Sequence, residues 1–130
     1  MDEKNLDIEN ILAKLSRKIL RVEEVSLILN NPVDFPTELV ENLALITAIR
    51  YWNNEINFED GDCIINNVYR FWWTNDFYVG NYPFSEIAWE CYEAFDAGEY
   101  PRTNDDKTID PAEKYTRPFI EDMLKKRNLI

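Results

Sequence analysis

Apolar residues recur three and four positions apart along most of this chain, the spacing that places them on one face of an α-helix. The first such stripe, in residues 6–29, consists of Ile8, Leu12, Leu15, Ile19 and Val22. Asn30, Asn31 and Pro32 follow it, and the residue before a proline is driven out of the helical conformation. The pattern therefore predicts one long helix over residues 6–29.

The second stripe covers residues 36–53, the least polar part of the chain. Pro36 stands at a favourable first helical position, and Glu38 falls in the first turn, where the helix dipole favours an acid. No charged residue occurs between Asn42 and Ile49. A helix that is apolar most of the way round is typical of a protein interior. We therefore expect this segment to be the central helix of the core.

Residues 57–75 fit two kinds of structure. Read as a helix, the segment carries acidic residues in its first turn and an apolar stripe that includes Val68. Read as strands, its β-branched and aromatic residues flank an Asn-Asn turn. The helical patterns on both sides favour the helix, and a short hairpin around residues 63–79 stays open as the alternative. We expect residues 76–82 to form a loop or a short extended piece.

Residues 83–100 carry an apolar stripe and an acidic stripe at the same helical period. Ser85 is the expected N-cap, and Gly98 is the expected residue just after the helix. The apolar stripe consists of Ile87, Cys91, Ala94 and Phe95, and the acidic stripe of Glu86, Glu90 and Glu93. Like charges four residues apart repel by roughly 0.2–0.5 kcal/mol per pair. The sequence thus predicts a helix with one face for the core and another for solvent or a partner.

The last helical pattern starts at Asp110, the expected N-cap, with Pro111 at the first helical position. Pro118 should kink or split this helix near residues 116–117, because proline has no backbone N–H to donate. Together the patterns predict an all-α fold, a single-domain bundle of about five helices over residues 1–130. The alternative is an α+β fold that contains the short hairpin.

Negative charge is concentrated in the middle of the chain, whose formal net charge is −11. Residues 1–54 contain nine acidic and six basic residues, residues 55–113 fourteen and three, and residues 114–130 two and five. The middle segment therefore carries a net charge of −11, and the outer segments cancel. Such a field repels nucleic acids and anionic membranes and speeds encounter with a basic protein. The simpler interpretation, that the charge only maintains solubility, stays open.

The residue types that most enzymes need are absent. The chain has no histidine, the commonest general base and transition-metal ligand. Its three glycines form no phosphate-binding loop, and Cys63 and Cys91 are too few for a four-ligand zinc site. We therefore expect no catalytic residues, no metal site, no cofactor and no enzymatic activity. A carboxylate site formed by Glu86 and Glu90 with Asp60 or Asp62, either as a pair of catalytic acids or as ligands of a divalent cation, is the remaining enzymatic alternative.

The N-terminal segment does not resemble an export signal. Residues 1–10 lack the basic and apolar regions of a signal peptide, and no apolar run approaches the roughly 20 residues of a membrane span. We therefore expect a cytoplasmic protein without membrane contact, in which Cys63 and Cys91 are reduced. Cys91 lies on the apolar face of its helix and is expected in the core.

Aromatic residues crowd into the acidic segment, with ten of them between Trp72 and Tyr100. Some of them must pack inward, but rings surrounded by carboxylates are typical of a surface that binds a basic protein, because rings fill pockets and acids orient the partner. The expected partner-binding residues are Asp76, Tyr78, Glu86, Trp89, Glu90, Tyr92, Glu93, Asp96, Glu99 and Tyr100. Arg70, the one base between Arg50 and Arg102, is expected to pair with an acid of this segment.

Two segments carry a resemblance to a known family: residues 84–100, FSEIAWECYEAFDAGEY, and residues 110–127, DPAEKYTRPFIEDMLKKR. In these segments, and in its size, charge and helical content, the chain resembles the small acidic immunity proteins that bacteria encode beside secreted toxins. The resemblance implies a protein that binds a cognate toxin, often a basic nuclease, and covers its active site. A nucleic-acid mimic that occupies the groove of a DNA- or RNA-binding enzyme ranks second, because the acids concentrate beside aromatics instead of spreading at phosphate-like intervals.

Overall fold

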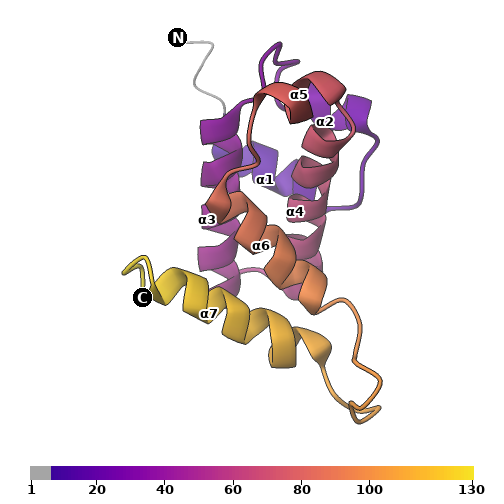
Figure 1. Cartoon of the computed structure of the whole chain (residues 1–130), viewed down its shortest axis with the longest axis vertical. Coiled ribbons are helices and arrows are strands. Elements are labelled where there is room, and N and C mark those ends of the chain that lie inside the picture. The colour runs from indigo at the N-terminus through magenta and orange to yellow at the C-terminus, as the bar shows by residue number, and fades with distance from the viewer. Residues whose placement is uncertain (1–6) are drawn as a thin grey trace.

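The computed structural model describes residues 7–130, which contain seven α-helices, one π-helical turn and no β-strand (Figure 1). The elements are α1 (Ile8–Ser16), α2 (Val22–Ile28), α3 (Thr37–Trp52), α4 (Phe58–Trp73), α5 (Asp76–Asn81), α6 (Glu86–Ala97), η1 (Ala112–Thr116) and α7 (Arg117–Lys125). The predicted all-α class is confirmed, although the helices outnumber the five expected. The hairpin alternative is wrong, because α4 is a continuous helix whose first turn is capped by the Asn57 side chain at 2.8 Å from the Asp60 amide.

The single helix predicted over residues 6–29 is wrong: α1 and α2 are separate helices, and the predicted start at Leu6 lies outside the described residues. The buried side chain of Asn67, on α4, fills the break between them. Its Nδ2 donates to the carbonyl oxygens of Leu15 and Lys18, both at 2.9 Å, and its Oδ1 accepts the Leu20 N–H at 2.8 Å. Asn67 therefore satisfies the backbone groups that the interrupted helix leaves without partners.

Arg70, one turn after Asn67 on the same helix, also contacts this break. Its Nη1 donates to the carbonyl oxygen of Leu20 at 2.8 Å. The ion pair predicted for Arg70 is absent from the part of the chain that the structure describes, and a backbone carbonyl takes its place. Two polar side chains of α4 thus fix the path of a segment nearly fifty residues earlier in the chain.

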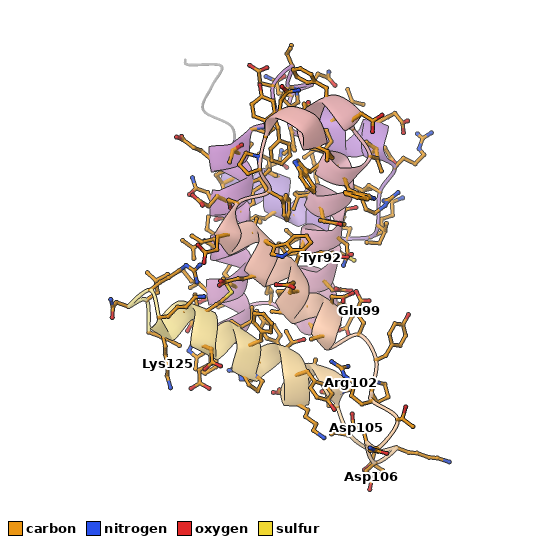
Figure 2. The ribbon with its side chains drawn as sticks, viewed as in Figure 1. Tyr92, Glu99, Arg102, Asp105, Asp106 and Lys125 are labelled. Carbon is orange, nitrogen blue, oxygen red and sulfur yellow. The ribbon has the colours of Figure 1, made fainter. Side chains whose placement is uncertain are left out.

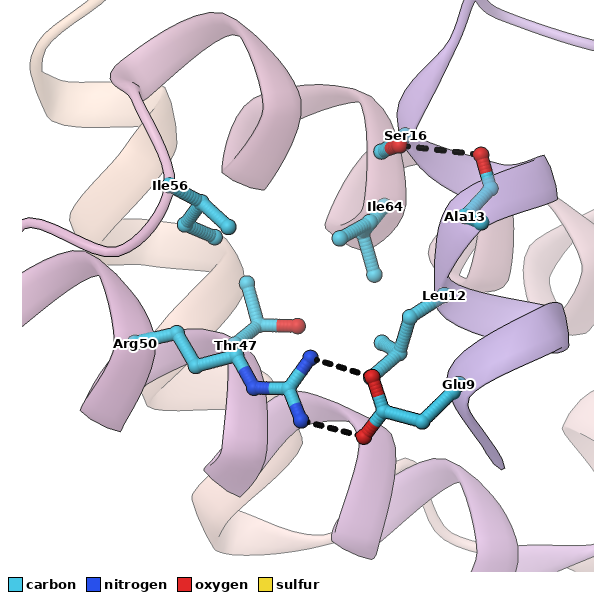
Figure 3. A pocket seen from close by; sticks show the side chains of 8 residues that line it. All are labelled: Glu9, Leu12, Ala13, Ser16, Thr47, Arg50, Ile56 and Ile64. Atoms are coloured by element: carbon cyan, nitrogen blue, oxygen red, sulfur yellow. Dashed lines mark hydrogen bonds and ion pairs between the residues drawn. The ribbon is translucent and has the colours of Figure 1, made fainter. Parts of the chain in front are cut away.

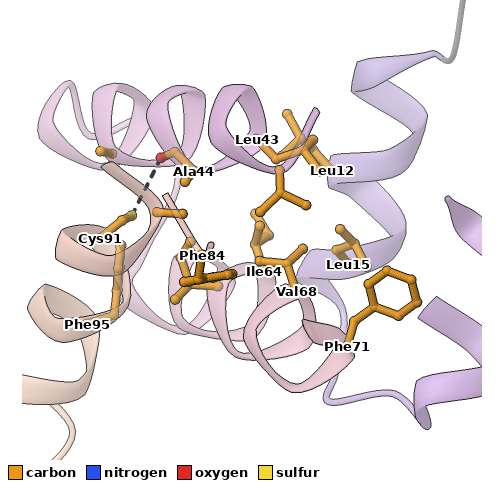
Figure 4. Close-up of a cluster of buried hydrophobic side chains, with 14 of the residues drawn as sticks. Leu12, Leu15, Leu43, Ala44, Ile64, Val68, Phe71, Phe84, Cys91 and Phe95 are labelled. Carbon is orange, nitrogen blue, oxygen red and sulfur yellow. Dashed lines mark hydrogen bonds between the residues drawn. The ribbon is translucent and has the colours of Figure 1, made fainter. Parts of the chain in front are cut away.

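The core is built around α3, as the sequence predicts, and α3 packs against α4, α6 and α7. Its buried residues are Val40, Leu43, Ala44, Thr47, Ala48 and Tyr51. Cys91 on α6 is fully buried against α3, and its thiol donates to the Ala44 carbonyl oxygen at 3.5 Å (Figure 4). Burial raises the pKa of the Cys91 thiol. The expected core position of Cys91 is confirmed, and both cysteines are free.

The two ends of α6 are fixed by different means. At the start, Ser85 Oγ accepts the Ala88 N–H at 3.3 Å, which confirms the predicted N-cap. At the end, Gly98 has a φ of −95°, so its role is not the left-handed turn that a glycine often supplies. A Cβ at this position would overlap Thr116 Oγ1 and stand 2.9 Å from the Cα of Ala112. Glycine is needed because α6 ends in direct contact with η1.

The last helical segment begins and divides where the sequence predicts. Asp110 Oδ1 accepts the Ala112 N–H at 3.0 Å, as an N-cap does. The following turn is π-helical, with the Arg117 N–H donating to the Ala112 carbonyl, and α7 then continues through Pro118. Pro118 has no N–H to donate, and the change of helical pitch falls directly before it.

Residues 76–82, predicted to be a loop, instead contain the short helix α5, capped by the Asn75 side chain. Tyr78 on this helix is buried, with its ring 5.4 Å from that of Phe35 and 5.3 Å from that of Phe71. Its hydroxyl donates to the Pro32 carbonyl oxygen at 2.6 Å. The prediction that Tyr78 lies on a partner-binding surface is therefore wrong, because the ring anchors α5 to the core.

Candidate functional site

Two rows of side chains, one from α4 and one from α6, meet where these helices pack against each other. We call these residues the α4/α6 seam. They are Asp62, Asn66, Tyr69 and Trp73 from α4, Trp89, Tyr92 and Asp96 from α6, and Glu99, the second residue after α6. All eight are partly or largely exposed. Tyr92 and Glu99 mark the middle and the lower end of the seam in Figure 2. The helices run in opposite directions, so one end of the seam is aromatic and the other acidic.

The aromatic end is a continuous stack of rings. The rings of Tyr69 and Tyr92 stack across the two helices, with centroids 4.0 Å apart and an angle of 19° between planes. Trp73 stacks on Tyr69 at 6.3 Å, and Trp89 on Tyr92 at 5.7 Å. Each such pair contributes roughly 0.5–1.5 kcal/mol beyond its buried area. Trp73 and Trp89 are nevertheless 56% and 40% exposed, so two large rings are held rigid and presented to solvent.

Carboxylates surround the exposed ring of Trp89. Glu86, Glu93 and Asp96 lie three residues before it and four and seven after it, which places all three on the outer face of α6. Each of them is exposed, and within residues 7–130 none takes part in an ion pair. The aromatic end of the seam therefore carries carboxylates that make no ion-pair contact among the described residues, although Glu93 lines the same groove as Lys114 and Lys126.

At the acidic end, the carboxyl group of Asp62 lies beside that of Glu99. Burial, a hydrogen bond with Glu99 and the charges of Glu99 and Asp96 raise the pKa of Asp62 to about 8. Asn66 Nδ2 donates to Asp62 Oδ1 at 2.9 Å and lies 3.4 Å from Glu99 Oε2. One amide is too weak a donor to stabilise two negative charges at this separation. At neutral pH Asp62 therefore keeps its proton.

This pair predicts a pH dependence of stability. The folded protein retains a proton on Asp62 that the unfolded chain releases near pH 4, so the stabilisation is complete at low pH and is lost as the pH rises toward 8. One proton accounts for at most about 1.4 kcal/mol per pH unit, and the partial exposure of Asp62 reduces this value. We expect Asp62→Asn to be more stable than the wild type at pH 8 by about 2 kcal/mol and nearly equal at pH 5.

Urea unfolding at the two pH values measures this difference. The matched control is Asp122→Asn, which makes the same substitution at an exposed position of α7, outside the seam and away from the charges that act on Asp62. It should shift the free energy of unfolding by a similar small amount at both pH values. Parallel curves for the wild type and Asp62→Asn would contradict a retained proton on Asp62.

Glu90, which the sequence predicts to contact a partner, already has partners within the chain. Its carboxylate accepts hydrogen bonds from Lys126 at 2.6 Å and Arg127 at 2.8 Å. Burial opposes ionisation of Glu90, but these two bonds outweigh it and lower its pKa. Glu90 therefore joins α6 to the end of α7, and its predicted contact with a partner stays a prediction.

The other predicted residues divide between the seam and its surroundings. Trp89, Tyr92, Asp96 and Glu99 are brought together, with Glu86 and Glu93 beside them. Asp76 begins α5 and Tyr100 stands in the connection after α6, both exposed and outside the seam.

The predicted partner-binding residues include none from the α4 half of the seam. Asp62, Asn66, Tyr69 and Trp73 are spaced four, three and four residues apart, which is a stripe on one face of a helix. These four residues share a face only if residues 57–75 are helical, so the stripe could be recognised only once the hairpin alternative was rejected.

No protein-family model, no curated protein and no solved structure matches this chain. Within residues 7–130 there is no group of three or more cysteine, aspartate or glutamate side chains placed to hold a metal ion. In the same range no helix has the length and apolar character to cross a bilayer.

Proposed function

We propose that this protein binds a basic protein, a bacterial toxin domain, through the α4/α6 seam and neutralises it by direct binding. The observation that carries the proposal is the pair of exposed tryptophans, Trp73 and Trp89, held by stacked tyrosines. Large exposed rings are unfavourable in water, and tryptophan and tyrosine are the residues that contribute most at protein interfaces. Their rigidity lowers the entropy that binding would otherwise cost.

The charge beside these rings supports a basic partner. Glu86, Glu93 and Asp96 make no ion pair in the described structure, although like charges this close on one helix repel. Lysine and arginine side chains of a partner would compensate them. The net charge of −11 would also accelerate the encounter with such a partner and disfavour nucleic acid.

Neutralisation follows if the surface that the seam covers includes the partner's substrate-binding site. A basic nuclease presents such a cationic surface, because it must bind phosphates. In this interpretation the protein is cytoplasmic and inert by itself, and it acts only as an inhibitor, as the immunity proteins that it resembles do.

The test uses the protein encoded by the reading frame next to this chain in its source genome. We expect that protein to stop growth when expressed alone, and growth to resume when this chain is co-expressed. In the purified complex, hydroxyl-radical oxidation of Trp73 and Trp89 should fall strongly, while Leu27 on α2, 67% exposed, should keep its rate. Toxicity that persists in the presence of this chain, or unchanged oxidation of both tryptophans, would contradict the proposal.

A further inference from the structure

A cavity of about 140 Å³ lies between α1, α3 and α4, and none of the seam residues lines it (Figure 3). Its apolar wall consists of Leu12, Ala13, Ile56 and Ile64. Close-packed interiors leave few voids larger than a water molecule. An apolar cavity of roughly 150 Å³ is large enough to hold one benzene molecule. The space is therefore suited to a small apolar group.

The polar groups in the wall already have hydrogen-bond partners. Thr47 Oγ1 donates to the Leu43 carbonyl oxygen at 2.7 Å, and Ser16 Oγ donates to the Ala13 carbonyl oxygen at 3.0 Å. Among the residues described, no buried side-chain nitrogen or oxygen lacks a partner. The lining thus contains no buried polar group that requires a bound water. Glu9 and Ala13 in the lining are exposed, so the cavity opens to solvent on their side.

An ion pair joins two residues of the cavity lining. Arg50 donates to both carboxylate oxygens of Glu9, with Nη1 2.9 Å from Oε1 and Nη2 bonded to Oε2 (Figure 3). The two partners differ in exposure: the Glu9 side chain is 69% exposed and that of Arg50 is 29% exposed. Glu9 can therefore return to water at little cost, whereas Arg50 stays at the cavity.

We propose that this cavity binds a small monocarboxylic acid whose apolar body is about the size of a benzene ring. The ring lies between α1, α3 and α4, and the carboxylate takes the place of Glu9 on Arg50. The guanidinium then keeps a bidentate partner, the strongest arrangement available to it. Arg50 is the one cationic side chain in the lining, so the cavity favours an anionic head group over an ammonium once Glu9 has turned away.

The probe is benzoate, titrated into the full chain while amide resonances are followed by heteronuclear NMR. We expect shifts confined to residues around the cavity, on α1, the second half of α3 and the start of α4. Benzyl alcohol, which has the ring without the charge, should bind at the same place and more weakly. Acetate, which has the charge without the ring, should produce no such shifts.

Two variants separate the roles of charge and volume. Arg50→Gln should weaken benzoate binding at least about tenfold and leave benzyl alcohol binding unchanged, because only the charged hydrogen bonds are lost. Ala13→Phe, which places a ring at the cavity, should abolish the binding of both. The control Arg21→Gln removes an exposed cation outside the lining and should have no effect.

The dispersion of the NMR spectrum shows whether each variant is folded. If Ala13→Phe fails to fold, Arg50→Gln alone decides the matter. Benzoate shifts that lie elsewhere on the protein, or benzoate binding that Arg50→Gln leaves unchanged, would overturn the proposal.

Discussion

Asn67→Ala is expected to lower the free energy of unfolding by about 3 kcal/mol. The side chain of Asn67 is fully buried and makes three hydrogen bonds, to Leu15, Lys18 and Leu20. Alanine would leave two carbonyl oxygens and one N–H without partners between α1 and α2. Leaving a buried polar group unpaired costs more than the net gain from forming its bond, so the loss exceeds that of an ordinary surface substitution.

Urea unfolding gives the size of this loss, and Asn66→Ala is the matched control. Asn66 is the preceding residue on the same helix, but it is partly exposed, and its amide bonds within α4 and to Glu99. Its replacement should cost about 1 kcal/mol or less. Equal losses for the two variants would show that Asn67 is not what fixes the break between α1 and α2.

Local signals along the chain were sufficient for most helix starts. Ser85 and Asp110 each cap the helix that the sequence assigns to them, and Pro118 divides the last helical segment where expected. The charge-free stretch between Asn42 and Ile49 correctly identified the central helix. These predictions succeeded because each depends on residues within one or two turns of one another.

Predictions failed where a distant side chain decides the structure. The break between α1 and α2 depends on Asn67, which lies 47 residues after Leu20. The spacing of apolar residues within 6–29 cannot indicate a contact with so distant a residue. Tyr78 looked like a loop residue because its contacts with Phe35 and Pro32 come from another part of the chain. In both cases tertiary contacts override the local preference.

The candidate site was half predictable for the same reason. The α6 row follows from one capped helix, so Trp89 and the acids beside it could be found from spacing alone. The role of Glu90 could not be found from spacing, because its partners Lys126 and Arg127 lie 36 and 37 residues later in the chain. The α4 row required a decision between helix and hairpin that residues 57–75 leave open by themselves.

Reversing the charge of the acids beside Trp89 is expected to weaken partner binding strongly. The variant Glu86→Lys, Glu93→Lys, Asp96→Lys should weaken binding to the product of the neighbouring reading frame by at least about 100-fold. Each new lysine replaces an attraction to a basic partner with a repulsion, and close charge pairs at interfaces have coupling energies of several kcal/mol. All three positions are exposed, so the fold should be retained.

The matched control reverses three exposed acids elsewhere, Glu23, Glu55 and Asp122. Both triple variants have the same net charge, so they lose long-range steering equally and differ only in where the charge lies. Glu23 stands in the first turn of α2 as Glu86 does in α6, which balances the effect on the helix dipole.

Binding through the α4/α6 seam is tested by the dissociation constants of the wild type and the two triple variants, measured by calorimetry at physiological salt. The interface described above predicts that only the variant at Glu86, Glu93 and Asp96 loses at least about two orders of magnitude in affinity. Equal affinities for the two variants would contradict binding through the α4/α6 seam.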